Sequence, residues 1–233
     1  MSIKTKAIAV FAALAICATS GVVLEAGPAS AGTPSCGHFC YNLSNKNPGS
    51  HFVLDVMSQA EKTGQPIILF TKSNSDPAQD WVVSDQGLVS DFFSAGMVSA
   101  QLNLHYSHME AYEVEYAPYG VDSGLCVGVA SIAFQGENVS LQPCGVGSRT
   151  VWVEDTADNT VYYHYYPMIN GSDTNFSHPF VATYPASAYP TDKPRPQLTV
   201  TELTGSAQTG SPSLPVIGTV NSNQLWKAYP GVS

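Results

Sequence analysis

Charge is scarce in this chain of 233 residues, because only 12% of its residues are Asp, Glu, Lys or Arg. Basic residues are the scarcer kind, with 9 Lys and Arg against 18 Asp and Glu, and the formal net charge is -9 at pH 7. Nucleic acids and anionic membranes are bound by Lys and Arg side chains that neutralise phosphate. The sequence therefore argues against both as partners.

Long helical and long apolar segments are also lacking. The one helix-like fragment, 56–63, has room for one to two turns and runs into Gly64 and Pro66, which stop a helix. Beyond the first residues, no stretch is apolar for long enough to cross a membrane. These absences favour an all-β protein.

The amino-terminal residues have the features of an export signal. Lys4 and Lys6 precede an apolar stretch, 7–18, and Ala-Ser-Ala at 29–31 is a typical cleavage sequence. A lipoprotein signal ending at Cys17 is disfavoured by the bulky Ile16 before it. We expect residues 1–31 to be removed and the protein to be secreted, and the alanine-rich signal is typical of bacteria.

Four cysteines remain after the signal, an even number that indicates two disulfides in an exported protein. The sequence allows three pairings, and we favour Cys126 with Cys144, because both lie in the two predicted strands of one repeat. Cys36 then pairs with Cys40. Zinc binding by Cys36 and Cys40 is disfavoured, because no second ligand pair has the expected spacing. We expect no metal and no cofactor.

Three tryptophans, Trp81, Trp152 and Trp226, divide the chain almost evenly. The first and last belong to Gln-x-Trp sequences that begin at Gln79 and Gln224, and each of the three follows a pair of predicted strands. A fixed internal period indicates a repeat architecture. The predicted strand pairs are 52–56 with 66–70, 125–129 with 139–142, and 179–183 with 197–200.

Further strands are predicted from alternating apolar residues and from β-branched and aromatic side chains. We expect an amino-terminal arm at 32–50 and one domain at 51–233, with repeats at about 51–122, 123–166 and 167–233 and long insertions. The alternative is another β-barrel or β-sandwich. The further predicted strands are 82–83, 87–89, 101–106, 111–116, 151–153 and 161–166.

The first repeat resembles the ricin-type β-trefoil lectins. The resemblance rests on Leu-Asp-Val at 54–56, Gly-x-Pro-x-x-Leu at 64–69 and Gln-x-Trp at 79–81. It implies three units around a pseudo-threefold axis, with the three tryptophans and Gln224 as structural residues. In that family, a sugar is held by an Asp, an aromatic ring and polar side chains near the Gln-x-Trp.

Carried over to this sequence, the resemblance implies one sugar site, in the first repeat. Asp55 is its hydrogen-bond acceptor, Phe70 its ring, and Gln79 orients Asp55. Ala78 stands where the family has an Asn, and Asn74 or Asp76 could substitute for it.

The other repeats lack these residues. The second has Gly128 at the Asp position, Gln142 at the ring position and Thr150 at the Gln position. The third has Ala182 at the Asp position. The second repeat is therefore interpreted as structural, and although the third keeps Gln224, only the first is interpreted as a sugar site.

No catalytic arrangement is predicted. Ser123 is out of register for a G-x-S-x-G sequence, and Glu113 and Glu115 on one strand face are interpreted as a solvated surface. We expect a non-enzymatic, monomeric protein that binds carbohydrate or a glycoconjugate. The alternative is a trefoil with decayed sugar sites that binds or inhibits a protein partner through residues 185–215.

Overall fold

The computed structural model describes residues 36, 40–47, 49, 51–155, 165–175, 178–185, 191–204 and 220–230. These residues contain twelve strands that fall into three successive sets of four. The first set is β1 (Tyr41–Asn45), β2 (Phe52–Val56), β3 (Ile67–Thr71) and β4 (Trp81–Leu88). The second is β5 (Glu110–Tyr116), β6 (Leu125–Val129), β7 (Val139–Pro143) and β8 (Val151–Glu154). The third is β9 (Met168–Asn170), β10 (Phe180–Thr183), β11 (Thr199–Glu202) and β12 (Trp226–Pro230).

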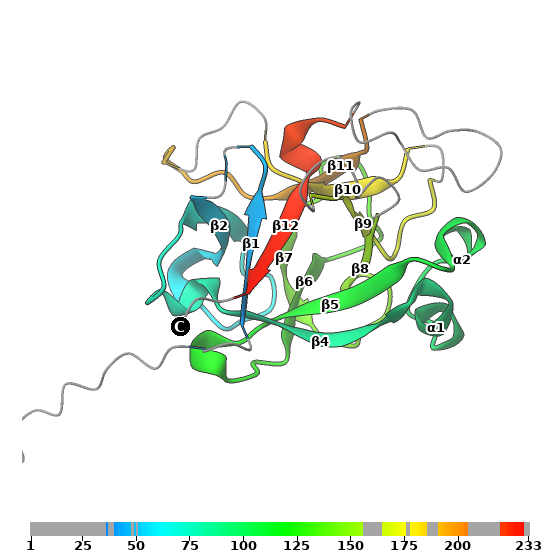
Figure 1. Cartoon of the computed structure of the whole chain (residues 1–233), viewed down its shortest axis with the longest axis horizontal. Coiled ribbons are helices and arrows are strands. Elements are labelled where there is room, and N and C mark those ends of the chain that lie inside the picture. Colours follow the sequence, from blue (N-terminus) through cyan, green and yellow to red (C-terminus); the bar gives the residue numbers. More distant parts are fainter. Residues whose placement is uncertain are drawn as a thin grey trace, which may run out of the picture. The chain divides into compact units, whose positions relative to one another are not determined.

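The first and last strand of each set form a barrel. β1 pairs with β4 and β12, β4 pairs with β5, β5 with β8, and β8 with β9. A bridge between Tyr166, just before β9, and Trp226 closes the ring. Figure 1 shows β1 and β12 side by side although they lie at opposite ends of the described chain. The barrel thus joins all three repeats.

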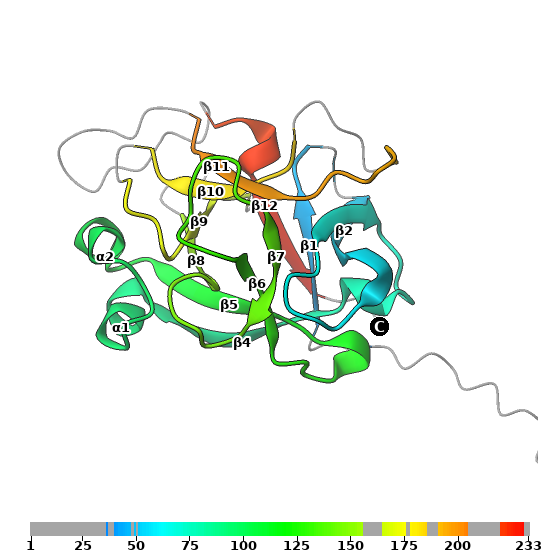
Figure 2. The ribbon, with the colours of Figure 1, turned by 180° about the vertical axis from the view of Figure 1, so that it is seen from behind.

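The middle strands of each set form three hairpins, β2 with β3, β6 with β7, and β10 with β11. Single bridges join the hairpins to one another, from Pro66 to Ser140, from Ile68 to Gln197 and from Asn138 to Thr199. The same hairpins are seen from behind in Figure 2. Each hairpin is therefore held by its two neighbours as well as by the barrel.

The three tryptophans occupy the same position in their repeats and are almost completely buried. Each indole N–H donates to a main-chain carbonyl of the hairpin in its own repeat: Trp81 to Leu54 at 3.1 Å, Trp152 to Val127 at 2.8 Å, and Trp226 to Ala182 at 2.8 Å. A buried Trp needs a partner for its single donor. These three bonds show which residues of the three repeats are equivalent: Leu54, Val127 and Ala182 occupy the same position.

The three predicted strand pairs are present as β2 with β3, β6 with β7 and β10 with β11, but one local strand prediction is wrong. Residues 101–106, predicted as a strand, lie in helix α2 (Ala100–Tyr106), which follows helix α1 (Val89–Ser94). The helix-like fragment 56–63 contains a single 3-10 turn, η2 (Met57–Gln59), in which Ser58 and Gln59 have positive φ angles of 61° and 55°. Figure 1 shows α1 and α2 beyond the ends of β4 and β5, so the insertion extends that barrel hairpin.

The repeat boundaries also differ from the prediction. β1 lies within 32–50, the predicted arm, and begins the first repeat, because it pairs with β2 and β4 of that repeat as well as with β12. In the predicted strand 161–166, residues 161–164 lie outside the described part. Within the described part, no helix is long and apolar enough to span a membrane.

Two apolar clusters stabilise this arrangement. One fills the space between barrel and hairpins and contains the three tryptophans. The other packs α1 and α2 against the outer side chains of β8, β9 and β10, and its helical members are Val89, Phe92, Leu102 and Tyr106. The disulfide predicted between Cys126 and Cys144 is present, with Cα atoms 4.9 Å apart, and so is that between Cys36 and Cys40.

Candidate functional site

The hairpin of the first repeat borders a hollow of about 280 Å³. Asp55 reaches it from β2, because Leu54 and Val56 on either side point into the core. Phe70 reaches it from β3, and both side chains belong to the predicted site. We call this space the first-repeat hollow, and it is lined by Asp55, Val56, Met57, Ser58, Gln59, Ile68, Phe70, Asp76, Ala78 and Arg195.

Gln79 holds the carboxyl group of Asp55 in place. Its Nε2 donates to Asp55 Oδ2 at 3.1 Å and to the carbonyl of Thr71 at 2.9 Å, while its Oε1 accepts from the Ser73 amide at 2.9 Å. Among the described residues, no donor is bound to the other carboxyl oxygen, Oδ1. Burial raises the pKa of Asp55 to about 7, and Asp76 adds to the rise, against the lowering effects of Gln79 and Arg195.

Asp76, not Asn74, supplies the second polar group of the hollow. Its Oδ1 accepts from Gln59 Nε2 and from the Ala78 amide, both at 3.0 Å. Asn74 lies on the exposed loop between β3 and η3 (Pro77–Gln79) and is not among the lining residues. Of the four predicted ligand residues, the structure therefore brings together Asp55, Phe70 and Gln79.

Arg195 is a lining residue that the sequence analysis missed. It belongs to the third repeat, and its guanidinium carbon lies 3.6 Å from the centre of the Phe70 ring. This is a cation–π contact, in which a planar guanidinium covers the ring face. Arg195 lies 125 positions after Phe70 in a proline-rich loop, so no local pattern indicates its place. The sequence analysis also missed Met57, Ser58 and Gln59, which the η2 turn brings to the hollow.

The second repeat has no room for an equivalent of Asp55. A Cβ atom placed on Gly128 would lie 2.8 Å from the Arg149 carbonyl oxygen and 2.9 Å from a methyl carbon of Thr150. Both contacts are far closer than packed atoms allow. Gln142, at the ring position, is buried and donates to Ser140 Oγ at 2.8 Å. The segment before Trp152 thus fills the place of a ligand.

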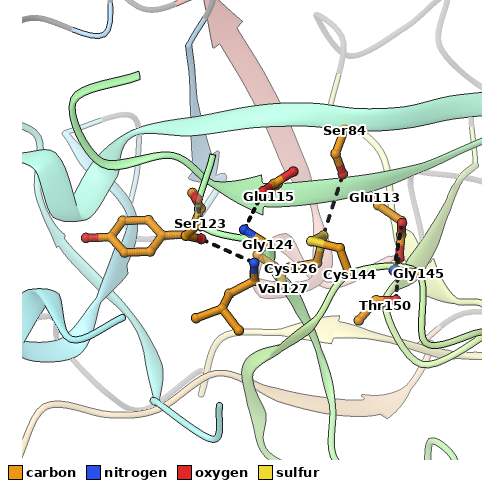
Figure 3. The surroundings of a disulfide bond; sticks show 12 residues. Ser84, Glu113, Glu115, Ser123, Gly124, Cys126, Val127, Cys144, Gly145 and Thr150 are labelled. Carbon is orange, nitrogen blue, oxygen red and sulfur yellow. Dashed lines mark hydrogen bonds between the residues drawn. A yellow bond between two sulfur atoms is a disulfide. The ribbon is translucent and has the colours of Figure 1, made fainter. Parts of the chain in front are cut away.

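The prediction that Glu113 and Glu115 face solvent is wrong, because only 3% and 7% of their surfaces are exposed. Glu113 accepts from the Gly145 amide at 3.0 Å and from the Thr150 hydroxyl, and Glu115 accepts from the Gly124 amide at 2.7 Å. Figure 3 shows these two groups on opposite sides of the disulfide of Cys126 and Cys144. They hold the chain next to each cysteine, which is a structural role.

In the third repeat, the residue equivalent to Asp55 is Thr183 and not Ala182 as predicted. Ala182 supplies the carbonyl that accepts from Trp226, as Leu54 does for Trp81, so the aligned position is one residue further on. Gln224 repeats the contacts of Gln79, donating to Thr183 Oγ1 at 3.4 Å and to the Glu202 carbonyl at 2.8 Å. A hydroxyl has replaced the carboxylate, and it is hydrogen-bonded to Thr201 at 2.8 Å.

One group of three side chains in the described part has atoms close enough to share a metal ion: Cys36, Cys40 and Asp80. The two sulfurs are paired in a disulfide, which leaves Asp80 as the remaining ligand. A structural or catalytic zinc needs at least three protein ligands. The group therefore does not fit a metal.

No protein-family model matches the chain, and no curated protein matches it in sequence. Among solved structures, the designed 3-fold symmetric protein ThreeFoil is similar, with a TM-score of 0.50 and 16% identity over 81% of this chain and 96% of that one. The Rhizoctonia solani agglutinin gives a TM-score of 0.48 and 18% identity over 82% and 94%. The exo-beta-1,3-galactanase 1,3Gal43A from Clostridium thermocellum gives 0.49 and 16% over 82% of this chain but only 30% of its own. Together with the three four-stranded repeats and the closed barrel, the similarity to ThreeFoil identifies the fold as a β-trefoil, as predicted.

Proposed function

We propose that the protein binds carbohydrate through the first-repeat hollow, and that it does so without catalysis. The observation that carries the proposal is the bond from Gln79 to Asp55, which fixes a carboxyl group at the wall of the hollow and leaves its Oδ1 as an acceptor. The matching positions of the other two repeats are Gly128 and Thr183. The resemblance to ricin-type lectins in the first repeat supports the same position.

The chemistry of the hollow suits a sugar. The carboxylates of Asp55 and Asp76 accept hydrogen bonds from hydroxyl groups, and the guanidinium of Arg195 donates to ring or hydroxyl oxygens. The ring of Phe70 packs against the guanidinium group of Arg195. In this arrangement the ring acts on the ligand through Arg195, which differs from the direct platform implied by the resemblance.

Titration calorimetry with common mono- and disaccharides, chosen by a glycan array, tests the proposal. We expect weak, monovalent binding, because one site provides no avidity. Asp55→Ala should abolish the heat of sugar binding, because it removes the acceptor for the sugar hydroxyl groups. Phe70→Ala should weaken sugar binding by about 1 kcal/mol, because Arg195 loses its contact with the ring. Gln142→Ala, at the position equivalent to Phe70 in the second repeat, should leave binding unchanged.

Melting curves of each variant separate binding from folding. A lower melting point for Asp55→Ala with unchanged sugar heat would assign Asp55 to bracing its hairpin only. Absence of heat with folded wild-type protein would refute the lectin proposal and favour the protein-binding alternative. In the loop region proposed for that alternative, 185–215, residues 186–190 and 205–215 lie outside the described part.

We also propose that the protein is exported and that residues 1–31 are removed. The support is the basic, apolar and Ala-Ser-Ala sequence of the amino terminus. Mass spectrometry of protein collected from the medium should give an amino terminus at Gly32. Detection of Met1, or of a lipid on Cys17, would contradict this proposal.

A further inference from the structure

The barrel strands line a second, partly open space of about 150 Å³, which we call the barrel cavity. None of its lining residues comes from the three hairpins. Five of the six barrel strands contribute, and Tyr166 lies just before the sixth, β9. The lining consists of Tyr41, Leu43, Trp81, Val82, Val83, Gln86, Tyr112, Val114, Glu154, Tyr166 and Ala228.

Three polar side chains of this cavity are linked by hydrogen bonds. The Tyr166 hydroxyl donates to the carboxyl group of Glu154 and accepts from the Tyr112 hydroxyl. Burial and the nearby Glu110 raise the pKa of Glu154 to about 7, so a large part of this group is ionised at neutral pH. The carboxylate is thus fixed among aromatic rings.

The barrel cavity adjoins a wider groove of about 630 Å³, which we call the acidic groove. The two spaces share Tyr41, Val82, Val83 and Gln86 as lining residues. A β-bulge between Val83 and Asp85 shifts the register of β4 here, and such bulges redirect side chains. The remaining residues of the acidic groove are Ser84, Asp85, Glu115 and Asp122.

The charges of both spaces have one sign. Four carboxyl groups line them, and neither Lys nor Arg is among their lining residues. Aromatic rings attract a cation through the negative potential of their faces, and the attraction is strongest where water is excluded. A carboxylate among such rings adds a charge-assisted partner.

We propose that the barrel cavity binds the ammonium head group of a small organic cation, with Glu154 as its counter-ion and the rings of Tyr41, Tyr112 and Tyr166 around it. The acidic groove attracts the cation and receives the remainder of the ligand. A cavity of about 150 Å³ is below the usual range for drug-sized ligands, so it suits a head group rather than a whole sugar. The mostly apolar lining also offers too few donors and acceptors for a sugar.

Choline and its uncharged isostere 3,3-dimethylbutan-1-ol provide a matched pair of probes. We expect calorimetric titration of the full mature chain at low salt to detect choline binding, with the isostere at least about tenfold weaker, because only the charge differs. Glu154→Gln keeps an acceptor for Tyr166 and should weaken choline binding by about tenfold or more. Glu137→Gln removes the same charge from the β6–β7 hairpin region and should have no effect on choline.

Three outcomes would overturn the proposal. These are equal affinities for choline and the isostere, no heat with choline while melting curves show folded protein, and unchanged choline affinity in folded Glu154→Gln. The barrel cavity shares no lining residue with the first-repeat hollow, and the titration uses no sugar. Its result is therefore independent of the carbohydrate proposal.

Discussion

At the scale of single residues, the buried carboxyl groups differ in how many hydrogen bonds they accept to offset the loss of water. Both carboxyl oxygens of Glu113 accept hydrogen bonds, from the Gly145 amide and the Thr150 hydroxyl, while Glu115 accepts one, from the Gly124 amide. Asp55 has one side-chain donor, Gln79, and its raised pKa shows that this bond does not offset burial. A carboxyl group with an unused acceptor suits a ligand site, whereas a fully bonded one suits a structural role.

Glu113→Ala tests the structural role. The change leaves the Gly145 amide without its acceptor and the Thr150 hydroxyl with only the Gly147 carbonyl at 3.3 Å, so we expect the free energy of unfolding to fall by about 1–3 kcal/mol. Glu110→Ala on the same strand is the control, because Glu110 is exposed, and it should change stability by no more than about 0.5 kcal/mol. Urea unfolding of both variants measures the difference. Equal effects would show that Glu113 contributes no more than a surface residue.

At the scale of secondary-structure elements, the insertion between β4 and β5 is the part that departs most from the sequence prediction. Leu102, Leu104 and Tyr106 alternate with polar residues, and in a strand they would share one face. In α2, Leu102 and Tyr106 are four residues apart and are 1% and 2% exposed, while Leu104 is 70% exposed. A segment this short fits both the two-residue period of a strand and the 3.6-residue period of a helix. Here the packing of Leu102 and Tyr106 in the second apolar cluster favours the helix.

This difference gives a matched pair of substitutions in one helix. Leu102→Ala should lower the free energy of unfolding by about 2–5 kcal/mol, because it leaves a cavity beneath the insertion. Leu104→Ala should change it by no more than about 0.5 kcal/mol. A strand would make the two leucines equivalent, so similar losses measured by chemical denaturation would contradict the helix.

The sequence predicts the elements that repeat and misses the contacts that are distant in the chain. Regular spacing of tryptophans and strand pairs was enough for the three hairpins, and the resemblance to ricin-type lectins implied the β-trefoil and Asp55 and Gln79 as neighbours. Arg195 over Phe70, and the amides that hold Glu113, join segments whose proximity exists only after folding. The third repeat was displaced by one residue, because the alignment of Thr183 with Asp55 depends on which carbonyl accepts from the tryptophan.

At the scale of the whole molecule, raised carboxyl pKa values recur in all three repeats. Burial is the largest cause in each case: the pKa is about 7 for Asp55 and Glu154 and about 6 for Asp80 and Asp173. The ordinary values are 3.8 for Asp and 4.5 for Glu. At pH values between the ordinary and the raised pKa of each group, the folded protein binds protons that the unfolded chain has released.

The sign of the pH dependence follows from this difference in bound protons. Stability falls with rising pH wherever the unfolded state binds fewer protons, so the free energy of unfolding should decrease from about pH 4 to about pH 7 and level off above the folded pKa values. The net charge of -9 at pH 7 acts in the same direction, because self-repulsion grows as the carboxyl groups ionise. Urea unfolding at pH 5, 6, 7 and 8 at constant ionic strength should show the decrease.

The double variant Asp55→Asn and Glu154→Gln is the control. It removes two of the four groups, so its free energy of unfolding should vary less with pH. A wild type that becomes more stable between pH 5 and 8 would contradict the raised pKa values.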